Sequence, residues 1–347
     1  MARLVLARLV LASLVLAGAA VLTGAAPAAA ATVPLPVSAV LAGDRQTSVV
    51  VDLSASTRPG PRSAEVTTDG VRRAATLVPL MSAGLAVTIV VDTSDADAAT
   101  LPAWLSAGAR FILEAPNGTR ATVIGDSAPA AVIAPPQQGP TGIVAALNGV
   151  RAHGSRDTAA ALALAAQQFP EVPAGRKVAV VYTGAADAGG PSATALAAQF
   201  RAAGVILVVA TTADASPYWT TVAEATGGFF APAGHPVVVP ALDQVESTLG
   251  GRYLVQFPTP AHRPATVPVQ VKTPDLTLAA DVALPAPATR PSPGYARELL
   301  TASAAVLVLA LLVGWALIYL ARRRRRPPPI VIAHGRAAVP TTPPQEP

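Results

Sequence analysis

The feature that most constrains the fold is an alternation of short β-rich runs with alanine-rich helical patterns, which starts at residue 85. Leu85–Val91 (LAVTIVV) is a continuous apolar run, as expected of a central strand that is buried on both faces. Strands that alternate with helices are typical of a mostly parallel sheet covered by helices on both sides. The pattern therefore predicts an open, doubly wound α/β fold whose last strand is Tyr253–Phe257.

The periodicity places each element of this fold within a few residues. The strands are expected at 85–91, 119–124, 131–134, 177–182, 205–210, 229–230 and 253–257, and the helices at 99–115, 142–150, 157–168, 192–203, 217–226 and 239–249. The flanking residues 32–83 and 259–284 alternate apolar and polar side chains without helical period. They predict a small β-rich, sandwich-like platform, in which the prolines at 264, 268 and 274 favour edge strands.

The two ends of the chain predict its location. Residues 1–31 combine two arginines, an apolar run and a final Ala-Ala-Ala, which is typical of a secretory signal peptide, with an uncleaved membrane anchor as the alternative. After a proline-rich stalk at 285–298, residues 299–320 form an uncharged stretch long enough to cross a bilayer. Five arginines follow directly and predict a cytoplasmic tail at 321–347. The chain is predicted to be a single-pass protein of the cell membrane with its N-terminal domain outside.

Charge and composition exclude several functions. Residues 32–298 hold 17 basic and 19 acidic side chains, so the excess of positive charge lies at the two ends and nucleic-acid binding is not expected. The chain has no cysteine, which excludes disulfides, thiolate metal sites and cysteine nucleophiles.

Several segments occur in an order that resembles a known family. Asp92-Thr93-Ser94-Asp95-Ala96 follows the first strand, Gly154-Ser155-Arg156-Asp157 precedes an alanine-rich helix, and VAVVYTG ends at Gly184. Their order and spacing over residues 84–258 resemble a von Willebrand factor type A (VWA) domain of a bacterial, membrane-anchored protein. The resemblance implies a Rossmann-like sheet whose carboxyl edge binds another protein.

The resemblance also implies a divalent ion held by an aspartate and two serines of the first loop, a threonine of the second and an aspartate of the third. Asp92 and Ser94 match this set, whereas Ala96, Arg156 and Gly184 stand at the other three positions. A guanidinium about 4 Å from a cation costs about 4 kcal/mol per unit charge at an effective dielectric constant of about 20. We therefore expect a degenerate site with no metal and no other cofactor, in which Arg156 pairs with Asp92.

A weak Mg²⁺ site stays open as an alternative. It would need Thr158 in place of Arg156, or the recruitment of a further carboxylate from Asp95, Asp97 or Asp187.

Other motifs carry less weight. Asp52-Leu53-Ser54-Ala55-Ser56 matches the metal motif literally, but Pro59 and Pro61 prevent the helix that must follow it, so we interpret it as a strand end and turn. Gly125-Asp126-Ser127 resembles the nucleophile block of some serine esterases, but no histidine has the required aspartate three residues before it. The four histidines have no metal-ligand spacing.

We therefore expect a non-enzymatic, membrane-tethered module that binds another protein, with no small-molecule substrate. The alternatives are a structural or assembly subunit of a bacterial membrane complex that acts through its span and tail and, with less support, a hydrolase that uses Ser127. Tyr218 and Trp219 are either an aromatic interaction anchor or part of the helix packing. The candidate partner-binding residues are Asp92, Ser94, Arg156, Asp157, Asp187, Asp214, Tyr218 and Trp219.

Overall fold

A computed structural model of the chain describes residues 32–286, apart from 44, 214–215, 235–244 and 246. The predicted signal peptide, the span at 299–320, the tail and most of the stalk lie outside these residues. Within the described part of the chain, no helix is both long and apolar enough to cross a membrane.

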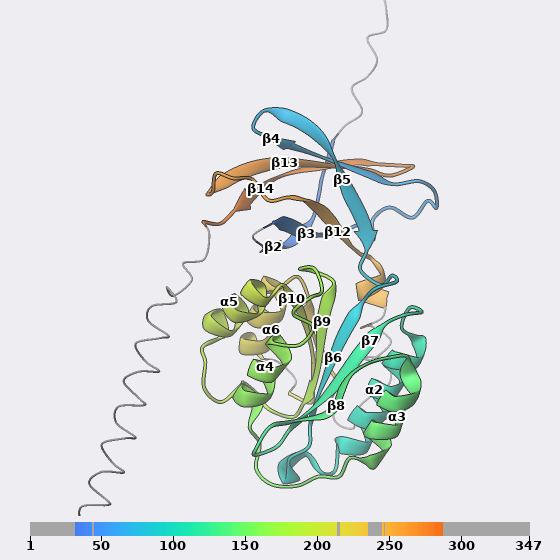
Figure 1. Cartoon of the computed structure of the whole chain (residues 1–347), viewed down its shortest axis with the longest axis vertical. Coiled ribbons are helices and arrows are strands. Elements are labelled where there is room, and N and C mark those ends of the chain that lie inside the picture. Colours follow the sequence, from blue (N-terminus) through green and yellow to red (C-terminus); the bar gives the residue numbers. More distant parts are fainter. Residues whose placement is uncertain (1–31, 44, 214–215, 235–244, 246, 287–347) are drawn as a thin grey trace, which may run out of the picture. The chain divides into compact units, whose positions relative to one another are not determined.

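The segment between residues 86 and 232 forms a six-stranded sheet with the order β11-β10-β9-β6-β7-β8 (Figure 1). Five of these strands are parallel, and β8 is an antiparallel edge strand beside β7. The strands are β6 (Ala86–Asp92), β7 (Arg120–Asp126), β8 (Ala131–Gln138), β9 (Lys177–Thr183), β10 (Val205–Thr211) and β11 (Phe229–Pro232). The predicted mixed α/β fold with a mostly parallel sheet is confirmed.

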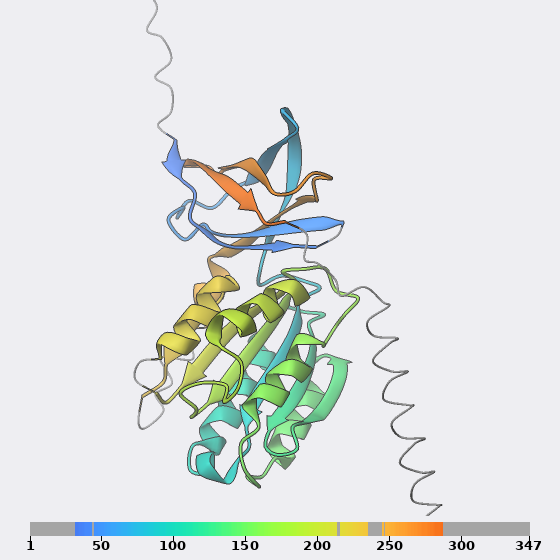
Figure 2. The same ribbon diagram turned by 90° about the vertical axis from the view of Figure 1, so that its left-hand side faces the viewer.

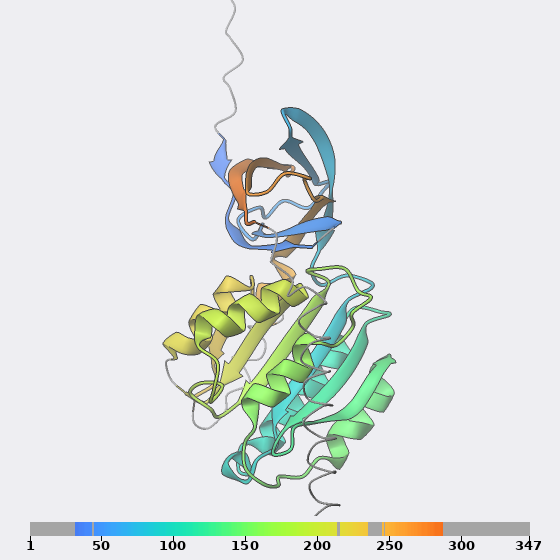
Figure 3. The same cartoon turned by 60° about the vertical axis from the view of Figure 1, so that its left-hand side comes forward.

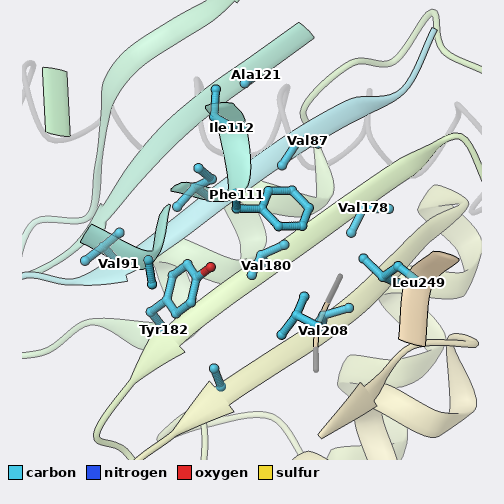
Figure 4. Close-up of a cluster of buried hydrophobic side chains, with 14 of the residues drawn as sticks. Val87, Val91, Phe111, Ile112, Ala121, Val178, Val180, Tyr182, Val208 and Leu249 are labelled. Carbon is cyan, nitrogen blue, oxygen red and sulfur yellow. The ribbon is translucent and has the colours of Figure 1, made fainter. Parts of the chain in front are cut away.

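Helices cover both faces of this sheet, because side chains that alternate along each strand bury opposite faces. Val178 and Val180 of β9 pack on one face with α2 (Leu101–Glu114) and α3 (Pro140–Gly149). Figure 4 shows part of this cluster, with Phe111 and Tyr182 among valines of the strands. The residues between them, Ala179 and Val181, pack on the other face. That face is covered by α4 (Thr158–Ala166), α5 (Ala193–Ala203) and α6 (Pro217–Ala225).

The remaining strands form a second, eight-stranded sheet with the order β1-β14-β13-β4-β5-β12-β3-β2. Leu35 and Pro36 join the two edge strands, and β2 also contacts β14, so the sheet is rolled around its own apolar core (Figures 2 and 3). The strands are β1 (Val33–Pro34), β2 (Val37–Ala42), β3 (Gln46–Asp52), β4 (Ser63–Thr68), β5 (Val71–Pro79), β12 (Arg252–Pro258), β13 (Ala265–Lys272) and β14 (Thr277–Leu284).

The structure corrects the predicted position of the last strand of the α/β fold. Tyr253–Phe257 lies within β12, which pairs antiparallel with β3 and β5 and belongs to the rolled sheet. The α/β sheet is thus inserted between β5 and β12, and the predicted domain end at 258 is wrong. A short, mostly apolar run predicts a strand but carries no information on which sheet supplies its partners.

The structure differs from the predicted edge position of Pro268. Pro268 lies in β13, an inner strand and not an edge strand. The β13–β4 ladder covers only Val269–Lys272, so Pro268 lies beyond it and is paired on one side only, with Asp281 of β14. The predicted helix at 239–249 lies largely outside the described residues, although Val245 and Leu249 pack in the core on the α2 side of the sheet.

Candidate functional site

At the carboxyl edge of the α/β sheet, three neighbouring parallel strands each end in a polar residue. Asp92 ends β6, Asp126 ends β7 and Thr183 ends β9, and Asp92 and Asp126 are directly paired in the register of β6 and β7. The carboxyl edge is the usual ligand-binding side of an open α/β sheet. All three side chains are fully buried, so each needs hydrogen-bond partners from the loops above.

Asp92 is the most heavily bonded of these residues. Its Oδ1 accepts hydrogen bonds from the backbone N–H and the hydroxyl of Ser94, at 3.1 and 2.6 Å. Its Oδ2 accepts from Nε of Arg156 at 2.6 Å, and from Thr183 Oγ1 and the N–H of Gly184 at 3.3 and 3.4 Å. The ion pair expected from the sequence therefore forms. Because Asp92 is completely buried, loss of the guanidinium would leave an uncompensated charge and cost about 3–5 kcal/mol.

Backbone hydrogen bonds hold Arg156 in this position. The loop between α3 and α4 is joined to the loop after β6 and to the loop after β7. The backbone N–H of His153 donates to the carbonyl oxygen of Thr93 at 2.8 Å, and the N–H of Asp95 donates to that of Gly154 at 2.9 Å. The N–H of Ala128, after β7, donates to the carbonyl oxygen of Ser155 at 2.7 Å. The guanidinium is thus placed by the fold of the loop, and its side chain is 29% exposed.

Asp126 anchors the start of α4. Its Oδ1 accepts from the backbone N–H of Asp157 at 2.8 Å, and its Oδ2 accepts from the hydroxyl of Thr158 at 2.6 Å. The pKa of Asp126 is raised to about 6, because burial, with a smaller contribution from the Asp92 charge, outweighs the lowering by the two hydrogen bonds and by Arg156. Asp126 therefore changes its charge in a mildly acidic range.

A third buried carboxylate, Asp97, lies on the same edge. It accepts hydrogen bonds from Trp104 Nε1 at 2.7 Å and from Thr100 Oγ1 at 3.0 Å. A methyl group placed on Gly184 would lie 2.5 Å from Asp97 Oδ1 and 3.4 Å from Arg156 Nη2. Asp97 thus occupies the space that any side chain at position 184 would need.

Ser127 and His153 form a polar pair beside this cluster. Ser127 Oγ lies 3.0 Å from His153 Nε2 and accepts from Thr93 Oγ1 at 3.0 Å, while His153 Nδ1 lies 3.1 Å from the carbonyl oxygen of Arg151. The sequence did not predict this pairing, because the two residues are far apart along the chain. Ser127 is only 3% exposed, so its hydroxyl has little access to a substrate.

A hollow of about 340 Å³ opens next to the guanidinium. It lies between the start of α4 and the loop after β9, and its polar side chains come from Arg156, Asp157, Thr158 and Asp187. Asp187 is exposed, and Asp157 is half-buried. Among the described candidates, these two and Arg156 are the ones that reach the surface of the hollow.

The other candidate residues lie differently. Asp92 and Ser94 are buried beneath the guanidinium, and Asp214 lies outside the described residues. Trp219 is fully buried, and its Nε1 donates to the carbonyl oxygen of Ala185 at 2.8 Å, so its interpretation as an exposed anchor is wrong. Tyr218 is half-buried against it, with the two rings edge to face at 5.0 Å. The pair belongs to the packing of α6.

The donor set does not fit a divalent ion. Arg156 Nε donates to Oδ2 of Asp92 and places a positive charge beside this carboxylate. Thr158, the alternative ligand, donates its hydroxyl to Asp126. Among the described residues, no group of three acidic or histidine side chains is arranged to hold a metal.

The segments that resemble the VWA family converge at this one edge. Arg156 and Gly184, from two segments that are far from Asp92 in sequence, both donate hydrogen bonds to the Asp92 carboxylate. They do so on a doubly wound sheet with a single antiparallel edge strand. This part of the chain has the sheet and the loop arrangement that the resemblance implies, and we refer to it as VWA-like.

Comparisons with known proteins give structural similarity only. No protein-family model matches the sequence, and no curated protein matches it. Among solved structures, the chain is similar to an aerotolerance-related membrane protein from Bacteroides fragilis (16% identity, 48% of this chain and 98% of that one, TM-score 0.41). It is also similar to a von Willebrand factor type A protein from Catenulispora acidiphila (12% identity, 74% and 73%, TM-score 0.44). A third is the conserved hypothetical protein BatB from Bacteroides thetaiotaomicron (13% identity, 48% and 97%, TM-score 0.42).

The structural roles of Asp97 and Asp126 were not predicted from the sequence. Asp126 directly ends a predicted strand, as Asp92 does, and parallel neighbours bring such positions together, so this signal was present in the sequence. The position of Asp97 beside Gly184 had no such signal, because it depends on the short 3₁₀ turn Asp95–Asp97 and on Trp104 of α2.

Proposed function

We propose that the chain is a membrane-tethered module, displayed outside a bacterial cell, that binds another protein through the loops at the carboxyl edge of its VWA-like sheet without a divalent cation. The observation that carries the proposal is the buried Asp92–Arg156 pair beneath an open polar hollow. The pair supplies internally the charge balance that a cation would otherwise supply, and the hollow presents the loops to a partner.

The chemistry of the hollow supports binding more than catalysis. Its lining offers two carboxylates and a guanidinium that is already engaged, and the Ser127–His153 pair is not among its lining residues. A hydrolase would need an accessible nucleophile within reach of a base and a substrate-sized pocket beside them. The predicted signal peptide and the span at 299–320 support display on a membrane.

Cross-linking and capture from the native membrane test this proposal. Asp187→Lys reverses an exposed charge at the hollow, and Asp281→Lys, at an exposed position of β14 in the rolled sheet, is the matched control. We expect Asp187→Lys to lose a cross-linked protein that the wild type and the control retain, with or without a chelator. Equal capture by all three proteins would contradict binding through these loops.

A deletion of residues 327–347 addresses the alternative. Loss of the same cross-linked protein after this deletion, with Asp187→Lys unaffected, would instead indicate an assembly subunit that acts through its tail.

A further inference from the structure

We propose that the end of the β4–β5 hairpin is a second binding surface, at which an extended acidic segment of another protein adds as a strand to β5. The surface belongs to the rolled sheet, so the inference does not depend on the loops at the carboxyl edge of the VWA-like sheet. Figures 2 and 3 show this hairpin projecting beyond the rest of the rolled sheet.

The strand β5 is longer than the ladder that pairs it with β12. On one side, β4 pairs with Val71–Ala75, whereas on the other side β12 pairs only with Thr76–Pro79. In the described part of the chain, no strand lies beside Val71–Ala75 on the side away from β4. We call this stretch the open edge, and an edge of this kind can take up a further strand.

The hairpin turn fixes which residues of β5 are bonded to β4. Asp69 and Gly70 have positive φ values of 53° and 73°, as the two central residues of a type I′ turn do. A two-residue turn makes the residues that flank it, Thr68 and Val71, a hydrogen-bonded pair. Every second residue of β5 after Val71 therefore bonds to β4.

The residues between these direct their backbone groups away from β4. They are Arg72 and Ala74 in the open edge, and the same alternation continues to Leu80. The N–H of Leu80 donates to the carbonyl oxygen of Arg252, at the start of β12, at 2.9 Å, which agrees with this direction. The N–H and C=O groups of Arg72 and Ala74 thus face a side on which the described chain provides no strand.

A hollow of about 320 Å³ lies beside the open edge. Its lining includes Arg73 and Ala74 of β5 and the segment 258–261 after β12. Val66 and Phe257, which belong to the core of the rolled sheet and are each 2% exposed, also line it. An added strand can therefore place an apolar side chain against the core while its backbone bonds to β5.

The residue types of the open edge indicate which strand it accepts. The edge strand β8 contains Pro135 and Pro136, which lack an N–H and so block pairing, but the open edge contains no proline. Arg72 and Arg73 are both exposed there. Full overlap with a second copy would place Arg73 opposite the same residue, and like charges directly opposite each other are destabilising. An acidic strand avoids this repulsion.

Hydrogen exchange of the full-length chain, purified in detergent, tests the inference with synthetic peptides. The probe is a peptide of about ten residues, an ordinary upper length for a strand, in which glutamate alternates with valine. A lysine–valine peptide is the charge control, and a glutamate–valine peptide with every amide N-methylated is the backbone control. Exchange is measured residue by residue by mass spectrometry, and affinity by calorimetry.

Two pairs of variants accompany the peptides. Ala74→Pro removes one N–H that faces the open side, and Ala74→Ser is its matched control. Arg72→Glu with Arg73→Glu reverses the charge of the open edge. Arg58→Glu with Arg201→Glu changes two exposed arginines outside the hairpin and is the matched control.

We expect the glutamate–valine peptide to slow the exchange of the Arg72 and Ala74 amides by about 10-fold or more, with a smaller change at Arg73. The lysine–valine and N-methylated peptides should bind at least about 10-fold more weakly. Ala74→Pro should weaken binding by a similar factor, and Ala74→Ser should not. The charge-reversed variant should prefer the lysine–valine peptide, and its control should behave as the wild type.

Several results would overturn the inference. They are absence of glutamate–valine binding to the wild type, equal binding of the N-methylated peptide, and slower exchange at Arg72 and Ala74 with rising protein concentration alone, which would make a second copy the occupant. If Ala74→Pro does not fold, the charge-reversed variant and the N-methylated peptide decide. Asp187→Lys, the variant that tests the proposed function, should bind the peptide as the wild type does, and loss of binding there would place the peptide at the other surface.

Discussion

Asp126 is a carboxylate whose charge state changes well above the pH range of an ordinary aspartate. Burial raises its pKa from 3.8 to about 6, so between these values the folded chain holds a proton that the unfolded chain has released. Its contribution to stability is therefore greatest at low pH and is lost as the pH rises through about 6, at a cost of at most about 3 kcal/mol.

Asp126→Asn keeps an oxygen for the N–H of Asp157 and an amide N–H for the hydroxyl of Thr158, and it removes the charge. We expect this variant to be more stable than the wild type at pH 8 by about 1–3 kcal/mol, with the difference vanishing near pH 4. Urea unfolding at a series of pH values measures it. Asp281→Asn, at an exposed site, is the control. A stability difference for Asp126→Asn that does not vary with pH would contradict the assignment.

Gly184 is required by its neighbours and not by its backbone conformation. A Cβ there would lie 2.5 Å from Asp97 Oδ1, and Asp97 cannot move without giving up its bonds to Trp104 and Thr100. We expect Gly184→Ala to destabilise the fold by about 1–3 kcal/mol. Gly149→Ala, at the end of α3 where no atom lies within 4 Å, should be neutral or stabilising by up to about 1 kcal/mol. Thermal unfolding compares the two, and equal effects would argue against crowding at Gly184.

At the residue scale, the Arg156–Asp92 pair was predictable and the place of Asp97 was not. The resemblance assigns Asp92 and Arg156 to two loops at one edge of the sheet, and their opposite charges then favour the pair. Asp97 instead depends on how one turn of 3₁₀ helix directs a side chain toward α2, a tertiary contact that no short pattern encodes.

Among the elements, α6 and α5 begin with the same kind of cap but differ in what else the cap does. Ser216 accepts from the N–H of Trp219 at 3.1 Å, and its hydroxyl donates to the carbonyl oxygen of Ala186, in the loop after β9, at 2.8 Å. Ser192 at the start of α5 accepts from the N–H of Ala195 at 3.2 Å and is exposed.

We expect Ser192→Ala to cost about 1 kcal/mol, as loss of an N-cap does. Ser216→Ala should cost about 2 kcal/mol, because Ser216 is itself buried and the carbonyl oxygen of Ala186 also loses its donor. Chemical unfolding of the two variants gives these values. A loss for Ser216→Ala no larger than that for Ser192→Ala would show that the bond between α6 and the loop after β9 contributes nothing.

Sequence patterns predict where the strands lie, but not which sheet each strand joins. The β-strands at 86–92, 177–183 and 205–211 are predictable because each is a buried apolar run followed by a helical period. The run at 253–257 is also predictable as a strand, yet it pairs with β3 and β5, which are about two hundred residues upstream. Its sheet is decided by partners distant in sequence, which its own pattern does not specify.

For the described part of the whole molecule, the two sheets share apolar contacts. Leu41 and Val50 of the rolled sheet belong to the same buried cluster as Val178 and Val208 of the VWA-like sheet. Polar contacts reinforce it, since Ser48 Oγ donates to the carbonyl oxygen of Ala174 at 2.8 Å. Because the chain enters and leaves the VWA-like segment through β5 and β12, neighbours in one sheet, we expect the two sheets to unfold together.

Val282→Ala tests this cooperativity. Val282 is 3% exposed in β14 and packs in the separate core of the rolled sheet, whereas Trp104 and Trp219 are both in the VWA-like segment. In a Trp315→Phe background, those two tryptophans supply the fluorescence signal. The cavity should cost about 1–3 kcal/mol and lower the unfolding temperature seen by tryptophan fluorescence and by far-ultraviolet circular dichroism by the same amount. If only the circular dichroism transition moves, the rolled sheet unfolds independently, and the shared cluster around Leu41 does not couple it to the VWA-like sheet.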